Sequence, residues 1–165
     1  MKVSVELADS HEAGAIAALR RSTSEQLTLQ YGRGHWSSCP TEPSVVRDIK
    51  NSRVLVARRG NAIVGTLCLG TKKPWAIDLK YFTAVPRTVY LHSMAVTPDY
   101  QRCGIGRRLL VEAGAIARAW PSHAIRLDAY DADAGAGGFY AKCGFREVGK
   151  AAYRNTLLVY YQMLL

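Results

Sequence analysis

Hydrophobic and polar residues alternate in some segments of the chain and recur with helical spacing in others. Residues 3–7 alternate, which predicts a half-buried strand. Asp9 or Ser10 then provides an N-cap for a helix that is expected to reach about Leu29. A second, shorter helix is expected over residues 43–49. The N-terminal part of the chain therefore predicts one strand followed by two helices.

The middle of the chain has the composition of strands. Residues 53–58 and 62–69 are rich in β-branched and apolar residues, and residues 59–61 (Arg-Gly-Asn) join them as a hairpin turn would. Residues 89–96 form another clear strand pattern, which Pro98 prevents from continuing. The segment before this strand mixes aromatic and polar residues without a firm period, so we expect either a ragged strand or a loop there.

The C-terminal part combines helices and strands. From Gly104 the apolar residues recur on one helical face, and Pro121 ends that helix. The remaining expected elements are a strand over 124–130, a helix over 134–142 and two strands over 145–148 and 157–164. The order of elements predicts an α/β fold with a mixed sheet, in a single domain over residues 1–165 without linker or repeat.

The composition is that of a globular protein with an excess of basic residues. Lys and Arg outnumber Asp and Glu by 22 to 13, giving a formal net charge of +9, so nucleic acid has to be considered as a partner. The basic residues are scattered singly and in pairs, without a basic stripe or an aromatic RNA-binding motif. We therefore expect no nucleic-acid partner.

Other features constrain the environment of the protein. The chain has no segment with the character of a signal peptide or a membrane span, so a cytoplasmic location without membrane attachment is expected. The four cysteines lack the close pairs of a zinc site and the density of a disulfide scaffold. We expect reduced thiols and no metal.

The segment that follows the strand over 89–96 carries candidate chemistry. Gly104 and Gly106 permit a tight turn at the start of a helix, where backbone N–H groups and the helix dipole attract anions. Arg102, Arg107 and Arg108 can add charge-assisted hydrogen bonds to a pyrophosphate. The sequence lacks the P-loop motif and the glycine pattern of a dinucleotide fold. A phosphate-bearing ligand is the hypothesis, and a tight turn with solvated arginines is the alternative.

Two motifs resemble those of a known family. Residues 101–106 (Gln-Arg-Cys-Gly-Ile-Gly) resemble the Q/R-x-x-G-x-G/A acyl-CoA signature of the GCN5-related N-acetyltransferase (GNAT) family. Residues 94–96 (Met-Ala-Val) resemble the L-A-V before that signature, and residues 138–145 resemble the motif F-Y-x-K-x-G-F. The resemblance implies a largely antiparallel mixed sheet with splayed central strands, flanked by about four helices, and acetyl-CoA as cosubstrate.

The resemblance also implies which residues hold the cosubstrate. The backbone of Met94, Ala95 and Val96 would pair with the pantetheine amides. The residues expected at the pyrophosphate are Gln101, Arg102, Cys103, Gly104, Ile105, Gly106, Arg107 and Arg108. Asp133 stands seven positions before Tyr140, where the family often has an asparagine. An aspartate accepts hydrogen bonds but does not donate them when ionised, so its contact with the cosubstrate stays open.

Two residues are candidates for catalysis. Tyr140 matches the family tyrosine near the thioester sulfur, where its phenol can donate a proton or a hydrogen bond to the departing thiolate. Packing alone is the alternative role for Tyr140. His92 matches the position at which many relatives have a glutamate base, and imidazole titrates near neutrality. A structural histidine is the alternative, and Ser93, expected on the opposite face of the strand, is the weaker candidate.

The function implied is acetyl transfer from acetyl-CoA to a primary amine by direct attack, without metal. The acceptor site is expected in the segments that vary within the family, with Tyr31, Trp36 and Tyr81 as candidate substrate-binding residues. The amine itself cannot be identified from these residues. A non-catalytic acyl-CoA-binding regulatory module is the alternative function, and a homodimer is a candidate assembly.

Overall fold

The computed structural model describes residues 2–165, which divide into two compact units. The first unit contains the residues up to Leu69 together with Ser93–Ala113, and the second contains Gly70–His92 and Gly114–Leu165. Strand β4 (Thr88–Val96) and helix α3 (Ile105–Ala119) each contribute residues to both units. We describe each unit by itself.

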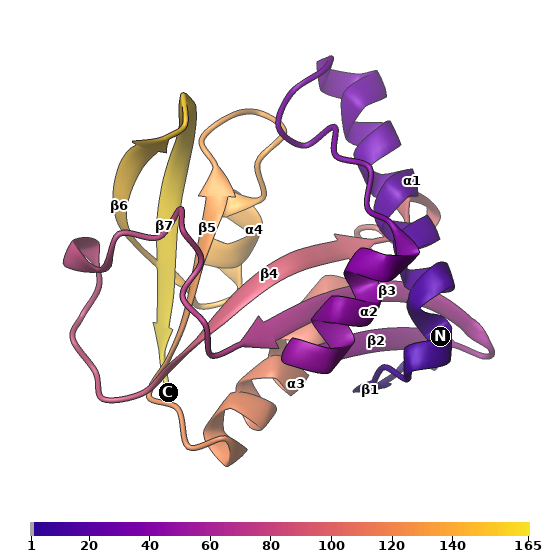
Figure 1. Cartoon of the computed structure of the whole chain (residues 1–165), viewed down its shortest axis with the longest axis horizontal. Coiled ribbons are helices and arrows are strands. Elements are labelled where there is room, and N and C mark those ends of the chain that lie inside the picture. Colours follow the sequence, from indigo (N-terminus) through magenta and orange to yellow (C-terminus); the bar gives the residue numbers. More distant parts are fainter. Residues whose placement is uncertain (1) are drawn as a thin grey trace. The chain divides into compact units, whose positions relative to one another are not determined.

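The first unit has an antiparallel sheet beside two helices. Strands β1 (Ser4–Leu7), β2 (Arg53–Arg59) and β3 (Ala62–Gly70) pair in that order, and the predicted hairpin between β2 and β3 is confirmed. Helices α1 (Ala13–Tyr31) and α2 (Glu42–Asn51) pack against each other, and α2 contacts β2. Figure 1 shows both helices on the same side of β2 and β3.

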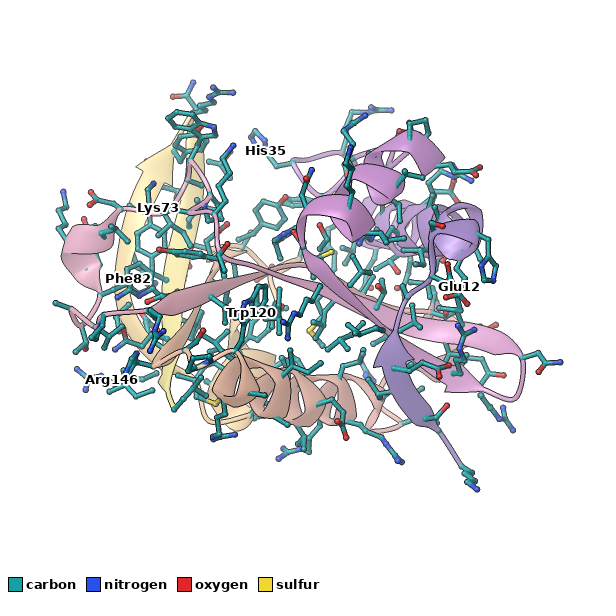
Figure 2. All side chains as sticks on the ribbon, turned by 60° about the horizontal axis from the view of Figure 1, so that its bottom comes forward. Glu12, His35, Lys73, Phe82, Trp120 and Arg146 are labelled. Carbon is teal, nitrogen blue, oxygen red and sulfur yellow. The ribbon has the colours of Figure 1, made fainter. Side chains whose placement is uncertain are left out.

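The start of α1 follows the predicted capping pattern. Asp9 and Glu12 form a capping box around a short 3-10 turn, Ser10–Glu12, which leads into the helix. The carboxylate of Glu12, which is labelled in Figure 2, also accepts a hydrogen bond from Arg58 of β2. The N-terminus of α1 is therefore attached both to its own first turn and to the sheet.

The core of the first unit lies between the helices and the sheet. Its buried members are Ala13, Ile16, Ala17, Val45, Val54, Val56 and Cys68. The first turns of α3 pack on β3 at Gly65, where an added Cβ would lie 3.0 Å from side-chain atoms of both Ile105 and Leu109. Glycine at position 65 therefore permits the close approach of α3 to the sheet.

A buried polar network connects α1, α2 and β3. Arg20 donates a hydrogen bond from Nη1 to Asp48 at 2.7 Å and another from Nη2 to Cys68 Sγ at 3.1 Å. Burial raises the pKa of the Cys68 thiol to about 12. Cys68 is therefore a neutral, buried hydrogen-bond acceptor and donor in this network.

The second unit contains the remaining strands and the shortest α-helix. Strand β5 (Ala124–Tyr130) pairs antiparallel with β7 (Thr156–Leu164), which pairs antiparallel with β6 (Arg146–Tyr153). Thr88–Tyr90 of β4 pair in parallel with Ala124–Arg126 of β5. Figure 1 shows helix α4 (Gly137–Lys142) beside β5 and β7. The whole strand order is β1-β2-β3-β4-β5-β7-β6.

The fold class agrees with the sequence, and two boundaries differ by three residues or more. The prediction of an α/β fold with a mixed, largely antiparallel sheet and about four α-helices is confirmed. Strand β6 extends five residues beyond the predicted Val148, to a two-residue turn at Arg154 and Asn155, which both have positive φ. Helix α4 starts at Gly137, later than predicted, because its glycine-rich approach forms a turn.

The connection between β3 and β4 packs on β7 rather than extending freely. Tyr160 donates a hydrogen bond from its hydroxyl to the carbonyl of Ala76, and its ring lies 5.4 Å from the ring of Phe82. Lys73 donates to the carbonyl of Ile77 at 2.8 Å. Lys73 and Phe82 are labelled in Figure 2.

Among residues 2–165, no helix is both long enough and apolar enough to span a membrane.

Candidate functional site

The segment between β4 and α3 has an unusual backbone. Thr97 donates its N–H to the carbonyl of Val64 in β3 at 3.0 Å, and Pro98–Tyr100 then form a 3-10 turn. Arg102 and Gly104 follow with φ of 60° and 82°, in the left-handed region that an arginine seldom adopts. Helix α3 begins directly after these residues, and the N-terminal end of a helix attracts anions. We therefore call residues 97–104 the anion loop.

The charge around the anion loop is suited to an anionic ligand. Arg102, Arg107 and Arg108 are exposed, whereas Ile105 is 2% exposed and anchors the first turn of α3 in the core. At the N-terminal end of α3, the N–H of Arg108 donates to the carbonyl of Gly104 at 3.1 Å. The N-terminal end of the helix, its dipole and the guanidinium groups together favour phosphate.

Glycine at position 104 is required by conformation rather than by space. Apart from its two chain neighbours, no residue of the described chain has a heavy atom within 4 Å of a Cβ built there, and φ is 82°. A side chain at this position would therefore extend into the volume in front of the loop while straining the backbone. The residues present fit a pyrophosphate.

The side chain of Gln101 is directed toward α1. Its Nε2 donates to Oε1 of Gln26 in α1 at 2.9 Å and to the carbonyl of Val96 at 3.0 Å. Thr23 of α1 also donates to Val96 O, at 3.5 Å. The Gln101 side chain is therefore hydrogen-bonded within the first unit to α1 and to the end of β4.

Strand β4 contains a local irregularity beside the candidate base. Ser93 has φ of 53°, so the strand does not continue with regular alternation at this point. The alternation used to place Ser93 opposite His92 therefore does not apply. His92, Met94 and Val96 are half-buried and Ala95 is buried.

Tyr140 lies in an aromatic cluster of the second unit. It is 7% exposed, and its ring centroid lies 5.4 Å from Phe139, 5.7 Å from Phe145 and 6.2 Å from Tyr161. Burial, and to a smaller extent the charges of Asp128 and Cys143, raise the pKa of the Tyr140 phenol. Tyr140 therefore keeps its proton at neutral pH, as a hydrogen-bond donor requires.

Asp128 is a candidate that the sequence analysis missed. It lies half-buried on β5 opposite Tyr160 of β7, and burial raises the pKa of its carboxyl group. Within residues 2–165 it has no cationic partner. Its charge raises the pKa values of Tyr130, Tyr140 and Tyr160, so the carboxylate and these phenols are electrostatically coupled. An acidic residue inside the apolar segment 124–130 was the available sequence signal.

The other predicted residues occupy different environments. Asp133 is exposed in the turn before α4 and makes no hydrogen bond within the described chain. Tyr31 and Trp36 lie in one short stretch, where Gln30 donates to the Tyr31 hydroxyl at 3.0 Å and Trp36 Nε1 donates to Gly32 O at 2.9 Å. Tyr81 belongs to the second unit and packs on Tyr160 at 5.4 Å.

A pocket of about 610 Å³ opens between α1 and the segment that follows it. Ser24 donates its hydroxyl toward the carbonyls of Trp36 and Ser38, at 2.6 and 2.7 Å, and Thr28 bonds Ser37 at 2.6 Å. These bonds fix the segment on α1. The pocket is lined by Arg21, Ser24, Glu25, Thr28, Leu29, Arg33, Ser37, Ser38 and Cys39. Its charged rim suits a polar ligand.

The structure thus groups the candidates within each unit. The anion loop, Val96 and the α1 residues Thr23 and Gln26 are joined by hydrogen bonds in the first unit. Tyr140 and Asp128 are coupled in the second. Among residues 2–165, no group of three or more His, Cys, Asp or Glu side chains is placed to hold a metal.

Comparison with known proteins adds a family and a fold. The profile of the acetyltransferase (GNAT) family matches residues 17–145, which include both motifs noted in the sequence. No curated protein sequence matches the chain at a significant level.

Solved structures resemble the chain over nearly its whole length. Ribosomal-protein-alanine N-acetyltransferase from Brucella melitensis is 21% identical, with a TM-score of 0.75 over 98% of this chain and 99% of that one. PaiA N-acetyltransferase from Thermoplasma acidophilum, solved with coenzyme A, is 14% identical, with a TM-score of 0.75 over 99% and 100%. The protein yncA from Salmonella typhimurium, solved with acetyl-CoA, is 18% identical, with a TM-score of 0.71 over 99% and 94%. At these identities the likeness establishes the fold.

Proposed function

Because the chain belongs to the acetyltransferase (GNAT) family, we propose that it transfers the acetyl group of acetyl-CoA to a primary amine of a small molecule, peptide or protein. The observation that carries the proposal is the anion loop. Its left-handed residues Arg102 and Gly104 directly precede the N-terminal end of α3, and Arg102, Arg107 and Arg108 are exposed in the same short stretch. The pyrophosphate of coenzyme A has the charge that this arrangement favours. Coenzyme A in the Thermoplasma structure and acetyl-CoA in the Salmonella structure are consistent with this cosubstrate.

The proposed mechanism is direct attack without a covalent enzyme intermediate. Acetyl-CoA supplies a thioester, whose carbonyl carbon accepts the nitrogen lone pair and whose sulfur leaves as a thiolate. Tyr140 is the proposed donor of a proton or hydrogen bond to that sulfur. Because burial raises the pKa of its phenol, Tyr140 keeps its proton and can offer a hydrogen bond to the developing thiolate.

The attacking amine has to lose a proton, and two groups of the second unit are candidates for accepting it. His92 is the base proposed from the sequence, since imidazole titrates near neutrality. Asp128 is the second candidate, because burial raises the pKa of its carboxyl group and no cation neutralises it within residues 2–165. The pH dependence of the rate in His92→Gln and Asp128→Asn variants distinguishes the two candidates. Replacing the residue that acts as the base should abolish the acidic limb of the pH–rate profile.

The acceptor is proposed to bind beside the C-terminal half of α1, in the first unit. Tyr31 and Trp36 lie in this region, and the pocket on α1 provides volume and charge for a polar substituent of the acceptor. Arg33 is exposed and has no hydrogen-bond partner within residues 2–165, so it is free to bind an acceptor carboxylate. Arg33→Gln should therefore raise the KM of carboxylate-bearing amines and leave that of their amides unchanged.

The test of the proposal is acetyl-CoA binding by calorimetry, followed by CoA release with a panel of amines. An Arg102→Gln/Arg108→Gln variant should bind at least tenfold more weakly, since each lost charge-assisted bond contributes about 1.5–3 kcal/mol. The matched control is Arg47→Gln, which removes an exposed arginine of α2. Failure of the wild type to bind acetyl-CoA would overturn the proposal. Binding without turnover of any amine would instead support the alternative, a non-catalytic acyl-CoA-binding regulatory module.

A further inference from the structure

We infer that Gln26 of α1 is a positioning residue for the anion loop and acts through the side chain of Gln101. The inference rests on the proposed function in one respect, since the loop is taken to be the acetyl-CoA site. It assigns to Gln101 a role different from direct contact with the pyrophosphate. It also assigns a role to Gln26, which lies 75 positions away in the sequence.

All N–H groups of Gln101 are hydrogen-bonded within the protein. Its side-chain Nε2 carries two hydrogens, which are directed to Gln26 Oε1 at 2.9 Å and to Val96 O at 3.0 Å. Its backbone N–H donates to the carbonyl of Pro98 at 3.2 Å. All three donors of Gln101 are therefore engaged within the protein. A phosphate oxygen needs a donor, and Gln101 has none left for it in this arrangement.

These hydrogen bonds fix the orientation of both amides. The carbonyl oxygen of Val96 can only accept, so the Gln101 atom that faces it must be the nitrogen. The same nitrogen faces Gln26, which must then present its oxygen. Reversing either amide would place two acceptors or two donors against each other. The pair therefore has one satisfied arrangement, with Gln26 as the acceptor.

The contact between Gln26 and Gln101 holds the end of the 3-10 turn in place. Gln101 ends the 3-10 turn and directly precedes Arg102, whose left-handed backbone starts the anion-binding stretch. Both glutamine side chains are half-buried, where a hydrogen bond is less exposed to competition from water. Thr23, one turn before Gln26 on α1, donates to the same Val96 carbonyl at 3.5 Å. Helix α1 therefore contacts the residues on both sides of the 3-10 turn, Pro98–Tyr100, in the first half of the anion loop.

A functional consequence follows from the two sides of α1. Thr23 and Gln26 face the loop, while Ser24 and Thr28 face the segment and the pocket proposed for the acceptor. A shift of α1 on acceptor binding would change the hydrogen bond to Gln101. Acetyl-CoA affinity and acceptor affinity should therefore depend on each other, and by linkage the effect is reciprocal.

The experiment compares three substitutions on α1. Gln26→Leu removes the acceptor at similar size, and Gln26→Glu keeps an oxygen that accepts from the same N–H. Gln30→Leu is the matched control, because within residues 2–165 the side chain of Gln30 bonds only the hydroxyl of Tyr31 next to it. We expect Gln26→Leu to weaken acetyl-CoA binding about five- to tenfold, and Gln26→Glu and Gln30→Leu to stay within about twofold of the wild type.

A double variant separates positioning from direct contact. Gln101→Leu should weaken binding at least as much as Gln26→Leu, because it also removes the bond to Val96 O. The double variant should lose little more than Gln101→Leu alone, because the contact with Gln26 is already gone. If Gln101→Leu weakens binding severely while Gln26→Leu has no effect, Gln101 contacts the ligand directly and the inference is wrong.

Hydrogen exchange provides a readout that does not depend on the ligand. In the free protein, the amides of Tyr100 and Gln101 should exchange faster in Gln26→Leu than in the wild type or Gln26→Glu, at unchanged thermal stability of the fold. Unchanged exchange would overturn the inference. Faster exchange in a protein whose wild type does not bind acetyl-CoA would sustain the positioning role and refute the proposed function.

Discussion

Arg126 and Thr83 are joined by a hydrogen bond of 2.7 Å, from Nη2 of the guanidinium to the backbone carbonyl oxygen. Arg126 is 5% exposed, and within residues 2–165 its Nε has no hydrogen-bond partner. Its guanidinium carbon lies 5.1 Å from the ring centroid of Phe82, and no carboxylate pairs with it within residues 2–165. The second unit thus contains a buried cation that is stabilised only by a carbonyl and an aromatic face.

Replacing this cation should cost little stability. Burial of an uncompensated charge is unfavourable, and an apolar residue of similar length removes that penalty. We expect Arg126→Met to change the free energy of unfolding by no more than about 1 kcal/mol, in either direction. Urea unfolding measures this. The comparison is Phe82→Ala, which removes a buried ring and should cost about 3 kcal/mol. A loss of similar size in Arg126→Met would show that the cation stabilises the fold.

Asp128 should reduce stability while serving function. The folded protein raises the pKa of its carboxyl group above that of the unfolded chain, so the native state holds the proton more tightly. Stability is then lost as the pH rises above the ordinary aspartate pKa of about 3.9. Asp128→Asn should therefore raise the Tm at neutral pH. The gain should disappear as the pH is lowered into the range where the wild-type carboxyl is protonated. Thermal unfolding across this pH range is the measurement, and a lower Tm at neutral pH would contradict the expectation.

Much of the fold follows from local patterns, as the hairpin of β2 and β3 illustrates. Arg59-Gly60-Asn61 supplies turn residues between two β-rich runs, and Gly60 does adopt a positive φ. Strand β6 was underestimated because its pairing with β7 shifts register between Glu147 and Gly149. A bulge of this kind breaks the period of two on which strand prediction depends.

The candidate site was predictable only where its residues are contiguous. The anion loop carries its own signal in closely spaced glycines and arginines. The contact between Gln26 and Gln101 joins segments 75 positions apart, and neither glutamine is unusual on its own helix or turn. Asp128 lies two residues after Arg126, a spacing that resembles the exposed face of a half-buried strand. Burial of both charges depends on segments that pack there from elsewhere in the chain.

Asp48 should be important for the stability of the first unit. Its carboxylate neutralises Arg20, which is 8% exposed, at a distance of 2.7 Å. Asp48→Ala leaves the guanidinium buried without its counter-charge, and we expect a loss of about 3 kcal/mol in the free energy of unfolding. Lys50→Ala, at an exposed position of the same helix, is the control and should change little. A loss below about 1 kcal/mol in Asp48→Ala would mean that water reaches Arg20 readily.

The cysteines should differ in reactivity and in their response to acetyl-CoA. Cys39 and Cys103 are exposed, whereas Cys68 is buried and has a pKa of about 12. A disulfide reagent at about pH 8 should label the exposed thiols quickly and leave Cys68 unmodified until the protein unfolds. Acetyl-CoA should slow the labelling of Cys103, in the anion loop, and leave Cys39 unchanged. Equal labelling rates of Cys103 with and without the ligand would place acetyl-CoA elsewhere.

The anion loop takes its shape from residues outside its own motif. Val64 accepts the N–H of Thr97, Gln26 accepts from Gln101, and Gly65 makes room for the first turns of α3. An engineer who grafts residues 97–104 and α3 onto another scaffold would thus obtain the glycines and arginines without the geometry that aligns them. A transplantable module would need the loop and α3 together with β3, the end of β4 and the C-terminal half of α1.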